Sequence, residues 1–357
     1  MSARPVCSIA PPDMLARLIE EGDPEQRAAA LRTLASSASL RARRALVGSL
    51  LRRLDVDVRA LGLLPETEGA RRTVYDVEHG GQSDLPGRRI RAEGDGPVED
   101  VAVNEAFDGA GATYDFYRDV YGRDSVDGEG AELVSSVHYG VGYDNAMWDG
   151  VQMIYGDGSG RLFVVGGLTR SLDIIGHELT HGVTQYTAGL EYSRQSGASN
   201  EHMSDVFGSL VKQYARGQTA EQADWLIGAG SLVPSLGEAL RSMKAPGTAW
   251  RFDTQPSTMD GYVELPDDND PANDNGGVHI NSGIPNHAFY LAATSLGGNA
   301  WEKAGRIWYA TLTDRLGPTS QFTDLAEATV DVARELFGGG DEQRAVEAAW
   351  AEVGVLP

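Results

Sequence analysis

The chain has little of three things that mark large classes of protein. Cys7 is its only cysteine, so no disulfide can form within the chain, and a reducing compartment is compatible with this composition. No run of about 18 apolar residues occurs, so the sequence predicts no membrane-spanning helix. Positive charge is scarce, because 52 Asp and Glu face 30 Lys and Arg and the net charge is −22. A nucleic-acid partner is therefore not expected, since a phosphate-binding surface needs basic clusters.

The most informative segment that is present is His177-Glu178-Leu179-Thr180-His181. Residues four apart share one face of a helix, so His177 and His181 can turn their imidazoles toward one metal ion, with Glu178 beside them. Glu201 then supplies a third ligand. Two His and one carboxylate form a zinc-ligand set that leaves one position open to water, and Glu178 can accept a proton from that water. The segment predicts a metalloprotease with one catalytic zinc ion.

A solvated helix with two unrelated His is the alternative, and the neighbouring residues argue against it. The motif follows Asp173-Ile174-Ile175-Gly176, whose apolar residues are typical of a buried helix. Downstream, Glu201 and Asp205 lie four apart and share a face of a second predicted helix. Asp205 can then accept the free N–H of a zinc-bound His and fix its tautomer.

The first part of the chain differs in charge from the rest. Residues 1–72 contain 12 Arg, no Lys and 9 acidic residues, a net charge of +3, which leaves −25 for residues 73–357. Asp23-Pro24-Glu25-Gln26 predicts a capped helix start, and residues 42–54 predict a second amphipathic helix. A basic helical segment before an acidic body predicts a prosegment that covers the active-site cleft, and a permanent regulatory or oligomerisation domain is the alternative.

Several further motifs follow one another in a fixed order between about residue 139 and the C-terminus. They are Asp144-Asn145-Ala146-Met147-Trp148, Tyr155-Gly156-Asp157-Gly158, Thr187-Ala188-Gly189-Leu190, Leu240-Arg241-Ser242-Met243, Asp274-Asn275-Gly276-Gly277-Val278-His279-Ile280-Asn281-Ser282-Gly283 and Val353-Gly354-Val355. Together with the zinc helix, this series resembles the thermolysin-like metalloproteases, and several motifs in order are far more specific than one.

The resemblance implies a role for each of a set of residues. Those implied for the chemistry are the zinc ligands His177, His181 and Glu201, the general base Glu178, the oxyanion-stabilising pair Tyr192 and His279, and Asp274, which would orient His279. Those implied for holding the substrate backbone by β-strand addition are Asn145, Ala146 and Arg241. Taken singly, each has an ordinary structural reading, such as a loop His or a salt-bridged Arg. His138, His202 and His287 match no catalytic position and are expected to be structural or surface residues.

The same resemblance indicates a specificity. Phe163, Ile174 and Leu240 match positions that line the pocket for the residue after the scissile bond, and all three are apolar. The implied activity is that of a neutral endopeptidase that cuts proteins or peptides on the N-terminal side of bulky hydrophobic residues. Core packing alone would explain any one of the three.

The sequence departs from thermolysin at its paired calcium site. Asp173 and Asp224 match acidic positions of that site, but the other matching positions are Lys212, Leu226 and Ala229. Calcium needs several oxygen ligands and a lysine ammonium repels it, so the paired site is predicted to be absent. The loop Asp267-Asp268-Asn269-Asp270 offers oxygens to a different calcium ion, although a solvated acidic loop is the more common role of such a sequence.

The N-terminal part resembles the protealysin subgroup, whose members have a short prosegment and no signal peptide. The motifs that carry this resemblance are Pro11-Pro12-Asp13-Met14-Leu15, Arg71-Arg72-Thr73-Val74-Tyr75-Asp76 and Leu85-Pro86-Gly87. We therefore expect a latent precursor in the cytoplasm, with export by an unconventional route left open, and with maturation between Leu54 and Thr73. Cys7 is expected to be an incidental thiol; the alternative is a thiolate in the fourth zinc position that holds the enzyme latent.

The predicted fold class is α+β, with the two-lobed thermolysin-like architecture. The predicted parts are a helical inhibitory prosegment over 1–70, a β-rich N-terminal lobe with the zinc helix over 71–186, and an α-helical C-terminal lobe over 187–357, with the active site in the cleft between the lobes. Alternation and turn signals predict antiparallel strands between 134 and 155. Later apolar periodicity predicts helices over 200–214, 282–296, 300–312, 322–336 and 341–353.

Two rival functions remain at this point. A zinc aminopeptidase also uses this His-Glu motif, but the usual Gly-Ala-Met-Glu-Asn signature of such enzymes does not occur in the chain. A catalytically silent binding protein would keep the fold without the chemistry, and the intact Glu178, Tyr192 and His279 speak against it.

Overall fold

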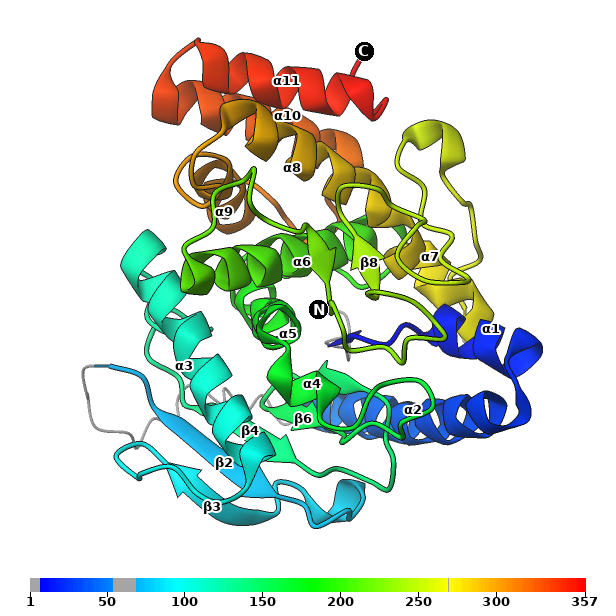
Figure 1. The fold of residues 1–357 in the computed structure, drawn as a ribbon. Coiled ribbons are helices and arrows are strands. Elements are labelled where there is room, and N and C mark those ends of the chain that lie inside the picture. The colour runs from blue at the N-terminus through cyan, green and yellow to red at the C-terminus, as the bar shows by residue number, and fades with distance from the viewer. Residues whose placement is uncertain (1–6, 54–68, 269) are drawn as a thin grey trace.

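A six-stranded sheet forms the centre of the first half of the chain in the computed structural model, which describes residues 7–53, 69–268 and 270–357. Its strands are β1 (Cys7–Ser8), β2 (Arg72–Asp76), β3 (Arg88–Ala92), β4 (Leu133–Val137), β5 (Ala146–Trp148) and β6 (Met153–Tyr155). Their order across the sheet is β1-β5-β6-β4-β2-β3 (Figure 1). The short strand β1 is therefore an edge strand, and it comes from the front segment of the chain.

The strand directions confirm part of the predicted arrangement and correct another part. β5 and β6 are antiparallel, as expected. β4, however, runs parallel to both β2 and β6, so the prediction of antiparallel pairing over 134–155 was wrong for this strand. The alternation of apolar and polar residues shows which face of a strand is buried, but it carries no information about the direction of its neighbour.

A long helix that the sequence analysis did not predict covers this sheet. α3 (Val101–Tyr121) begins at Asp100, whose side chain accepts hydrogen bonds from the N–H groups of Ala102 and Val103, and it ends at the left-handed Gly122. Inside α3, Gly109 allows the helix to approach the zinc helix, because a Cβ there would lie 2.3 Å from Ile175 Cδ1. The lobe is therefore β-containing rather than β-only.

The second half of the chain is mainly helical, as predicted. Its helices are α6 (Arg194–Arg216), α7 (Asp274–Asn281), α8 (Gly283–Leu296), α9 (Ala304–Asp314), α10 (Phe322–Phe337) and α11 (Asp341–Glu352). Two short strands, β7 (Leu226–Ile227) and β8 (Arg241–Ser242), pair between α6 and α7. The helix α5 (Leu172–Tyr186), preceded by the single turn α4 (Gly167–Arg170), lies between this lobe and the sheet (Figure 1).

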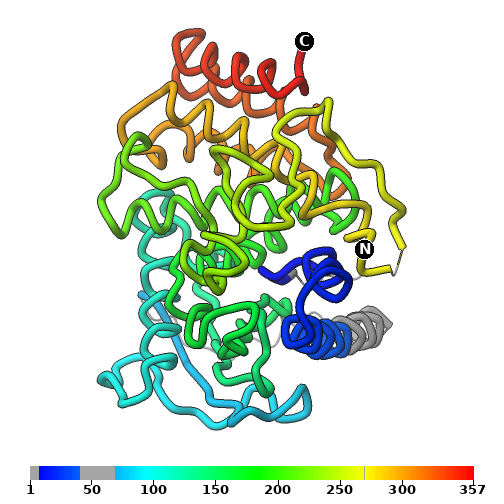
Figure 2. Tube along the Cα trace, turned by 45° about the vertical axis from the view of Figure 1, so that its right-hand side comes forward, coloured from blue at the N-terminus to red at the C-terminus, as the bar shows by residue number. Residues whose placement is uncertain are grey.

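The front segment forms two helices that lie against the cleft between the lobes. α1 (Pro12–Glu21) contacts the turn over Pro271–Asn273, and α2 (Pro24–Arg53) packs against α1 and reaches the segment before β5 through Ser37 and Thr33 (Figures 1 and 2). The predicted cap of α2 is confirmed: Asp23 Oδ1 accepts from the N–H of Gln26 at 2.9 Å, and Gln26 Oε1 accepts from the N–H of Asp23 at 3.1 Å.

The prediction of a second helix in this segment was wrong, and two other predictions fall outside the described residues. The amphipathic stretch expected over 42–54 is not a separate helix, because residues 42–53 continue α2. No Gly or Pro interrupts the chain between the two stretches, so nothing ends the helix there. The expected maturation interval falls largely on 54–68, which lie outside the described residues, as does the side chain of Cys7.

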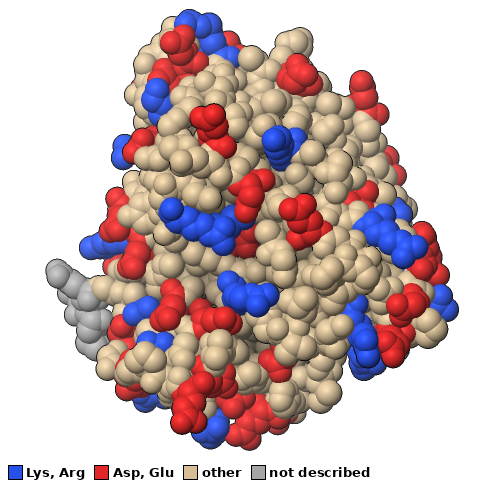
Figure 3. All heavy atoms as spheres, viewed as in Figure 1, with Lys and Arg blue, Asp and Glu red and all other residues tan. Residues whose placement is uncertain are grey.

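Two further features concern membrane-spanning helices and the charge on the surface. Within the described ranges, no helix is both long enough and apolar enough to cross a membrane. On the face of the molecule drawn in Figure 3, acidic and basic side chains are interspersed over the surface.

A buried lysine occupies the place where the sequence departs from thermolysin. Lys212 Nζ, on α6, lies 2.9 Å from Asp173 Oδ2 on α5, 2.7 Å from Asp224 Oδ1 and 2.6 Å from the carbonyl oxygen of Leu226. Three oxygens, one from α5 and two from the segment 224–226, therefore converge on one ammonium group. The amide of Gly228 also donates to Asp173 Oδ2, at 3.1 Å.

We expect Lys212→Met to lower the free energy of unfolding by about 3–5 kcal/mol, because it leaves the carboxylate of Asp173 buried without its cation. Thermal or urea unfolding measures this. Lys303→Met is the matched control, since Lys303 pairs with Glu342 at 2.7 Å but its side chain is 45% exposed, against 3% for Lys212, and an exposed pair contributes about 0–1 kcal/mol. Calcium should leave the midpoint of the wild type unchanged. Equal losses for the two variants would contradict the role of Lys212.

Candidate active site

The predicted zinc helix and the helix that follows it cross at two glycines. A Cβ on Gly176 of α5 would lie 3.1 Å from Gly208 Cα, and a Cβ on Gly208 of α6 would lie 2.5 Å from the carbonyl oxygen of Asp173. Only glycine allows the two backbones to approach this closely. The crossing places His177 and His181 of α5 opposite Glu201 of α6.

The three predicted zinc ligands meet at one point. His177 Nε2 and His181 Nε2 are 3.1 Å apart, and each lies 3.4 Å from an oxygen of Glu201. Two atoms that are each about 2.0–2.1 Å from a tetrahedral zinc ion lie about 3.3–3.4 Å apart, so this spacing fits zinc. Glu201 Oε2 is also buried and has no hydrogen-bond partner among the described residues. A cation held by these three side chains would satisfy it.

The outer nitrogen of each His is fixed by a partner on the neighbouring helix. His177 Nδ1 lies 2.8 Å from Asp205 Oδ1, and His181 Nδ1 lies 2.8 Å from Asn200 Oδ1. With the Nδ1 atoms donating, both Nε2 lone pairs face the common point, as a metal site requires. The site also favours positive charge: burial raises the pKa of the Glu201 carboxyl, but the neighbouring His279, His181 and His177 outweigh it and hold that pKa well below its usual range.

Asp205 has further partners, which connect the metal site to the rest of the cleft. Arg241 Nε and Nη2 donate to its two oxygens at 2.8 Å each, and Asn286 Nδ2 donates to Oδ2 at 2.9 Å. Although burial opposes ionisation, these contacts, led by Arg241, lower the pKa of Asp205. The predicted partner of a zinc-bound His and the predicted substrate clamp are therefore in direct contact.

Glu178 is on α5, next to His177 in the sequence, and lies beside the three predicted ligands. Its Oε2 accepts a hydrogen bond of 2.8 Å from the backbone N–H of Trp148 in β5, and its Oε1 is buried and unpartnered within the described part of the chain. Burial raises the pKa of this carboxyl to about 8, a larger effect than the opposing charge of His177. A carboxylate with such a pKa accepts a proton readily near neutral pH.

The two predicted oxyanion-stabilising residues lie on the other side of Glu201. Tyr192 Oη donates to Glu201 Oε1 in a short hydrogen bond and lies 3.0 Å from His279 Nε2. His279 Nδ1 is 2.6 Å from Asp274 Oδ1. Burial alone would lower the pKa of His279, but the charges of Asp274 and Glu201 raise it to about 9.

An unusual turn aims Asp274 at His279. Residues 274–277 all have positive φ, from 47° at Asp274 to 83° at Gly276. For the two non-glycine residues, Asp274 and Asn275, this left-handed conformation is uncommon and strained. It turns Asp274 Oδ2 back onto the N–H groups of His279 and Ile280, at 2.6 and 3.3 Å.

The residues predicted to hold a substrate backbone are in contact with the front segment of the same chain. β1 pairs antiparallel with β5, and Ile9 N–H continues the pairing to the carbonyl oxygen of Ala146 at 3.0 Å. Asn145 Oδ1 accepts from the N–H of Ala10 at 2.8 Å, and Asn145 Nδ2 donates to the Ala10 carbonyl at 3.3 Å. Arg241 Nη1 donates to the carbonyl oxygen of Ile9 at 3.4 Å.

The three predicted pocket residues are all buried in the cluster that contains Ile9. Leu240 and Ile174 are neighbours, because both have atoms within 3.4 Å of the position that a Cβ would take on Gly228. The backbone N–H of Phe163 donates to Asp144 Oδ1 at 3.1 Å, directly beside Asn145. Phe163 is thus tied to the segment that also carries Asn145.

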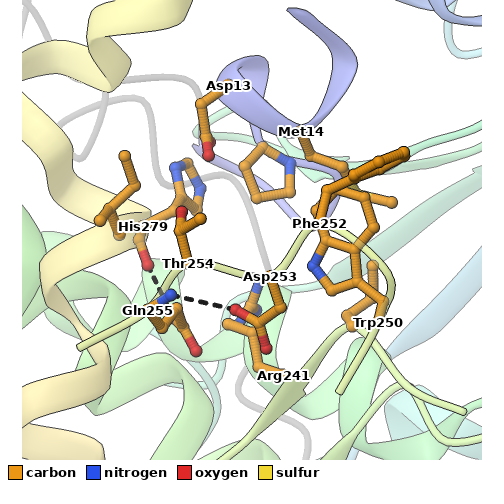
Figure 4. Close-up of a pocket in the computed structure, with 12 residues that line it drawn as sticks. Asp13, Met14, Arg241, Trp250, Phe252, Asp253, Thr254, Gln255 and His279 are labelled. Carbon is orange, nitrogen blue, oxygen red and sulfur yellow. Dashed lines mark hydrogen bonds between the residues drawn. The ribbon is translucent and has the colours of Figure 1, made fainter. Parts of the chain in front are cut away.

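Figure 4 shows a residue that the sequence analysis did not assign to the site. Asp13 of α1 lies beside His279, and together with Asp274 these side chains place three ligand atoms within 4.8 Å of one another. Asp13 Oδ1 is buried without a hydrogen-bond partner in the described residues. Met14, Arg241 and Gln255 line the same cavity of about 30 Å³, and Gln255 Nε2 donates to the His279 carbonyl at 2.7 Å.

Comparison with known proteins identifies the class of this site. Residues 67–185 match the family model of the thermolysin metallopeptidase catalytic domain, and residues 188–355 match that of the thermolysin metallopeptidase α-helical domain. The chain therefore belongs to the thermolysin family of metallopeptidases, which are metalloendopeptidases, as its motifs predicted.

Comparison with individual relatives indicates the subgroup within this family. The chain is 47% identical to an extracellular metalloprotease of Pectobacterium carotovorum subsp. carotovorum over 99% of this chain and 98% of that protein. It is 41% identical to thermolysin of Alicyclobacillus acidocaldarius subsp. acidocaldarius over 82% of this chain but 52% of that one. The solved structure of the precursor of protealysin, a metalloproteinase from Serratia proteamaculans, matches with a TM-score of 0.84 and 45% identity, covering 98% of this chain and 99% of that chain. The predicted resemblance to both family and subgroup is confirmed.

We expect Asn200→Ala to weaken zinc binding by about tenfold, because His181 loses the partner that fixes its outer nitrogen. The effect should stay near the lower end of the range for such partners, since Ser204 Oγ also contacts His181 Nδ1 at 3.0 Å. Competition with a chelator of known affinity measures it. Asn299→Ala is the control, because Asn299 bonds only the exposed Glu302 in this structure, and an unchanged zinc affinity of Asn200→Ala would contradict the assignment.

Proposed function

We propose that this chain is the latent precursor of a zinc-dependent neutral endopeptidase that cuts on the N-terminal side of bulky hydrophobic residues. The observation that carries the proposal is the meeting of His177, His181 and Glu201 at zinc-ligand spacing, with the unpartnered Glu178 Oε1 beside them. Zinc bound there would act as a Lewis acid, lowering the pKa of water and polarising a substrate carbonyl.

The chain's own residues would divide the remaining work. Glu178, held by the N–H of Trp148, takes a proton from the attacking water and passes it to the leaving nitrogen. His279, kept positively charged by Asp274, and the hydroxyl of Tyr192 donate hydrogen bonds to the oxyanion as it forms. Both donors already lie beside Glu201, and the hydroxyl of Tyr192 would turn from Glu201 Oε1 to the oxyanion as the charge develops.

The proposed specificity rests on the apolar pocket residues. Phe163, Ile174 and Leu240 offer no buried charge to a side chain placed among them. An apolar side chain gains free energy on entering such a site, and an acidic one loses its hydration without a compensating partner. Arg241, Asn145 and the carbonyl of Ala146 would hold the substrate backbone alongside.

We infer that residues 1–70 act as an intramolecular inhibitor, and four contacts support this. Residues 7–10 already pair with β5 and use the backbone clamp, so a substrate strand has no free edge to join. α2 is attached to the segment just before Asn145, since Ser37 Oγ lies 2.7 Å from Tyr143 Oη and Thr33 Oγ1 accepts from the N–H of Asp144 at 3.2 Å. The proposed catalytic lobes are then 71–186 and 187–357.

The test of the activity is cleavage of an internal bond in a peptide that is blocked at both ends and carries one Leu or Phe. We expect the zinc-loaded protein to cut before that residue after the lag that latency imposes, and Glu178→Ala, treated in the same way, to lose about 10²–10⁴-fold in kcat/KM while still binding zinc. Glu327→Ala, an exposed Glu on α10, is the matched control. A protein that leaves the blocked peptide intact but trims free N-termini would instead be an aminopeptidase.

Latency has its own test in α1. Leu15 is 1% exposed, so Leu15→Asp places a carboxylate in the apolar core against which α1 packs. Leu31 is 50% exposed, so the carboxylate of Leu31→Asp stays in contact with water and serves as the control. Replacing a buried Leu costs at least about 2 kcal/mol, which shifts the docked-to-undocked ratio by more than about tenfold. We expect a correspondingly shorter lag before activity for Leu15→Asp alone, followed continuously with the blocked peptide. Identical lags for the two precursors would contradict inhibition by docking.

A further inference from the structure

The front segment occupies the cleft in one defined direction and register. Cys7 is opposite Trp148 and Ser8 is opposite Met147, in antiparallel pairing. The next residue, Ile9, has its N–H on the carbonyl oxygen of Ala146 and its carbonyl on Arg241. The backbone is therefore gripped on both sides of Ile9 by the groups that the proposed function assigns to substrate.

The register leaves one peptide group facing away from β5. In an antiparallel pair, N–H and C=O groups of successive residues point alternately toward and away from the neighbouring strand. Because Ile9 N–H points toward β5, the carbonyl of Ser8 points away from it. α5, which carries two of the metal ligands and Glu178, contacts both β1 and β5.

Two contacts, one from the backbone N–H of Trp148 and one from the side chain of Arg241, relate this carbonyl to the chemistry. Trp148, the strand partner of Cys7, donates its N–H to Glu178 Oε2 at 2.8 Å. Arg241, which holds the Ile9 carbonyl, also holds Asp205, the partner of His177. The Ser8–Ile9 bond thus lies between the proposed base and the clamp that is joined to the metal site.

The residue after this bond also suits the apolar pocket. Ile9 is fully buried, and it belongs to the main hydrophobic core, which also includes Phe163, Ile174 and Leu240. It is a bulky aliphatic residue, of the kind that the proposed specificity requires on the C-terminal side of the bond.

We propose that the zinc-loaded precursor cuts its own chain between Ser8 and Ile9, as an intramolecular step separate from maturation between 54 and 73. The inference rests on the proposed endopeptidase activity. One water molecule is consumed: its oxygen becomes part of the new Ser8 carboxylate, the C–N bond breaks, and Glu178 carries the proton to the Ile9 nitrogen.

The cut would not by itself release the inhibitor. The piece before Ile9 would lose its covalent link, and its described residues, Cys7 and Ser8, are held by the short pairing of β1 with β5. Residues from Ile9 onward would remain, because Met14, Leu15 and Leu18 of α1 are buried and Asn145 still holds Ala10. The clipped precursor would therefore stay latent until the later cut.

The experiment follows the intact mass and the N-terminal sequence of full-length protein, purified with a chelator and then given zinc. We expect a species that begins at Ile9 to appear first, at a rate independent of protein concentration, and Glu178→Ala to stay whole. Ile9→Leu should be cut like the wild type, and Ile9→Gly, which keeps the backbone contacts but has no side chain for the pocket, at least about tenfold more slowly.

The blocked peptide, assayed in parallel, separates failure of this inference from failure of the proposed function. If the peptide is cut while residues 1–8 stay attached to Ile9 until maturation, the self-cleavage is overturned and the activity stands. If the wild type cuts neither the peptide nor itself, both are overturned. A Ser8–Ile9 cut whose rate rises with protein concentration would show cleavage between molecules and would overturn the intramolecular step.

Discussion

The carboxylate of Asp205 is the point on which the geometry of the cleft depends. It is fully buried, and its two oxygens receive His177 from α5, Arg241 from β8 and Asn286 from α8. One charge thus holds the outer nitrogen of His177, the guanidinium of Arg241 and the amide of a third helix. Because removing one member of a buried ionic network leaves the others uncompensated, these elements are constrained to keep their positions together.

The front segment enters the cleft with its backbone held at Ile9 and Ala10. Ile9 and Ala10 are held by their amide and carbonyl groups, which every peptide possesses. Recognition of this kind is independent of sequence, so the same contacts serve an inhibitor and a substrate. What makes the segment persist is the covalent connection to α1 and α2, which keeps its local concentration high and adds apolar burial away from the reacting groups.

Some of the site was predictable from the sequence because local spacing determines it. His177, Glu178 and His181 are brought together by one helical turn, and the order of the later motifs placed Tyr192, Asp274 and His279 by resemblance. Asn200 received no role from the sequence, because its contact with His181 arises from the crossing of two helices at Gly176 and Gly208. The contact between Trp148 and Glu178 uses a backbone N–H, which any residue other than proline at that position would supply.

The fold shows the same division between local and non-local information. The later helices and the cap at Asp23 followed from periodicity and capping residues. The parallel direction of β4 did not, because it depends on which strands meet after the chain has passed along α3. The position of Asp13 beside His279 could not be predicted from the sequence either, because these residues are far apart in the chain and meet only when the prosegment docks.

Lys212 has a consequence for the conditions under which the fold persists. A bound ion stabilises a protein according to its free concentration, so a calcium-held junction weakens wherever calcium is scarce or chelated. An ammonium group that is part of the chain is present at a fixed stoichiometry of one and cannot dissociate. The junction of α5, α6 and the segment around Asp224 is therefore insensitive to the ionic composition of its surroundings at the three oxygens that Lys212 contacts.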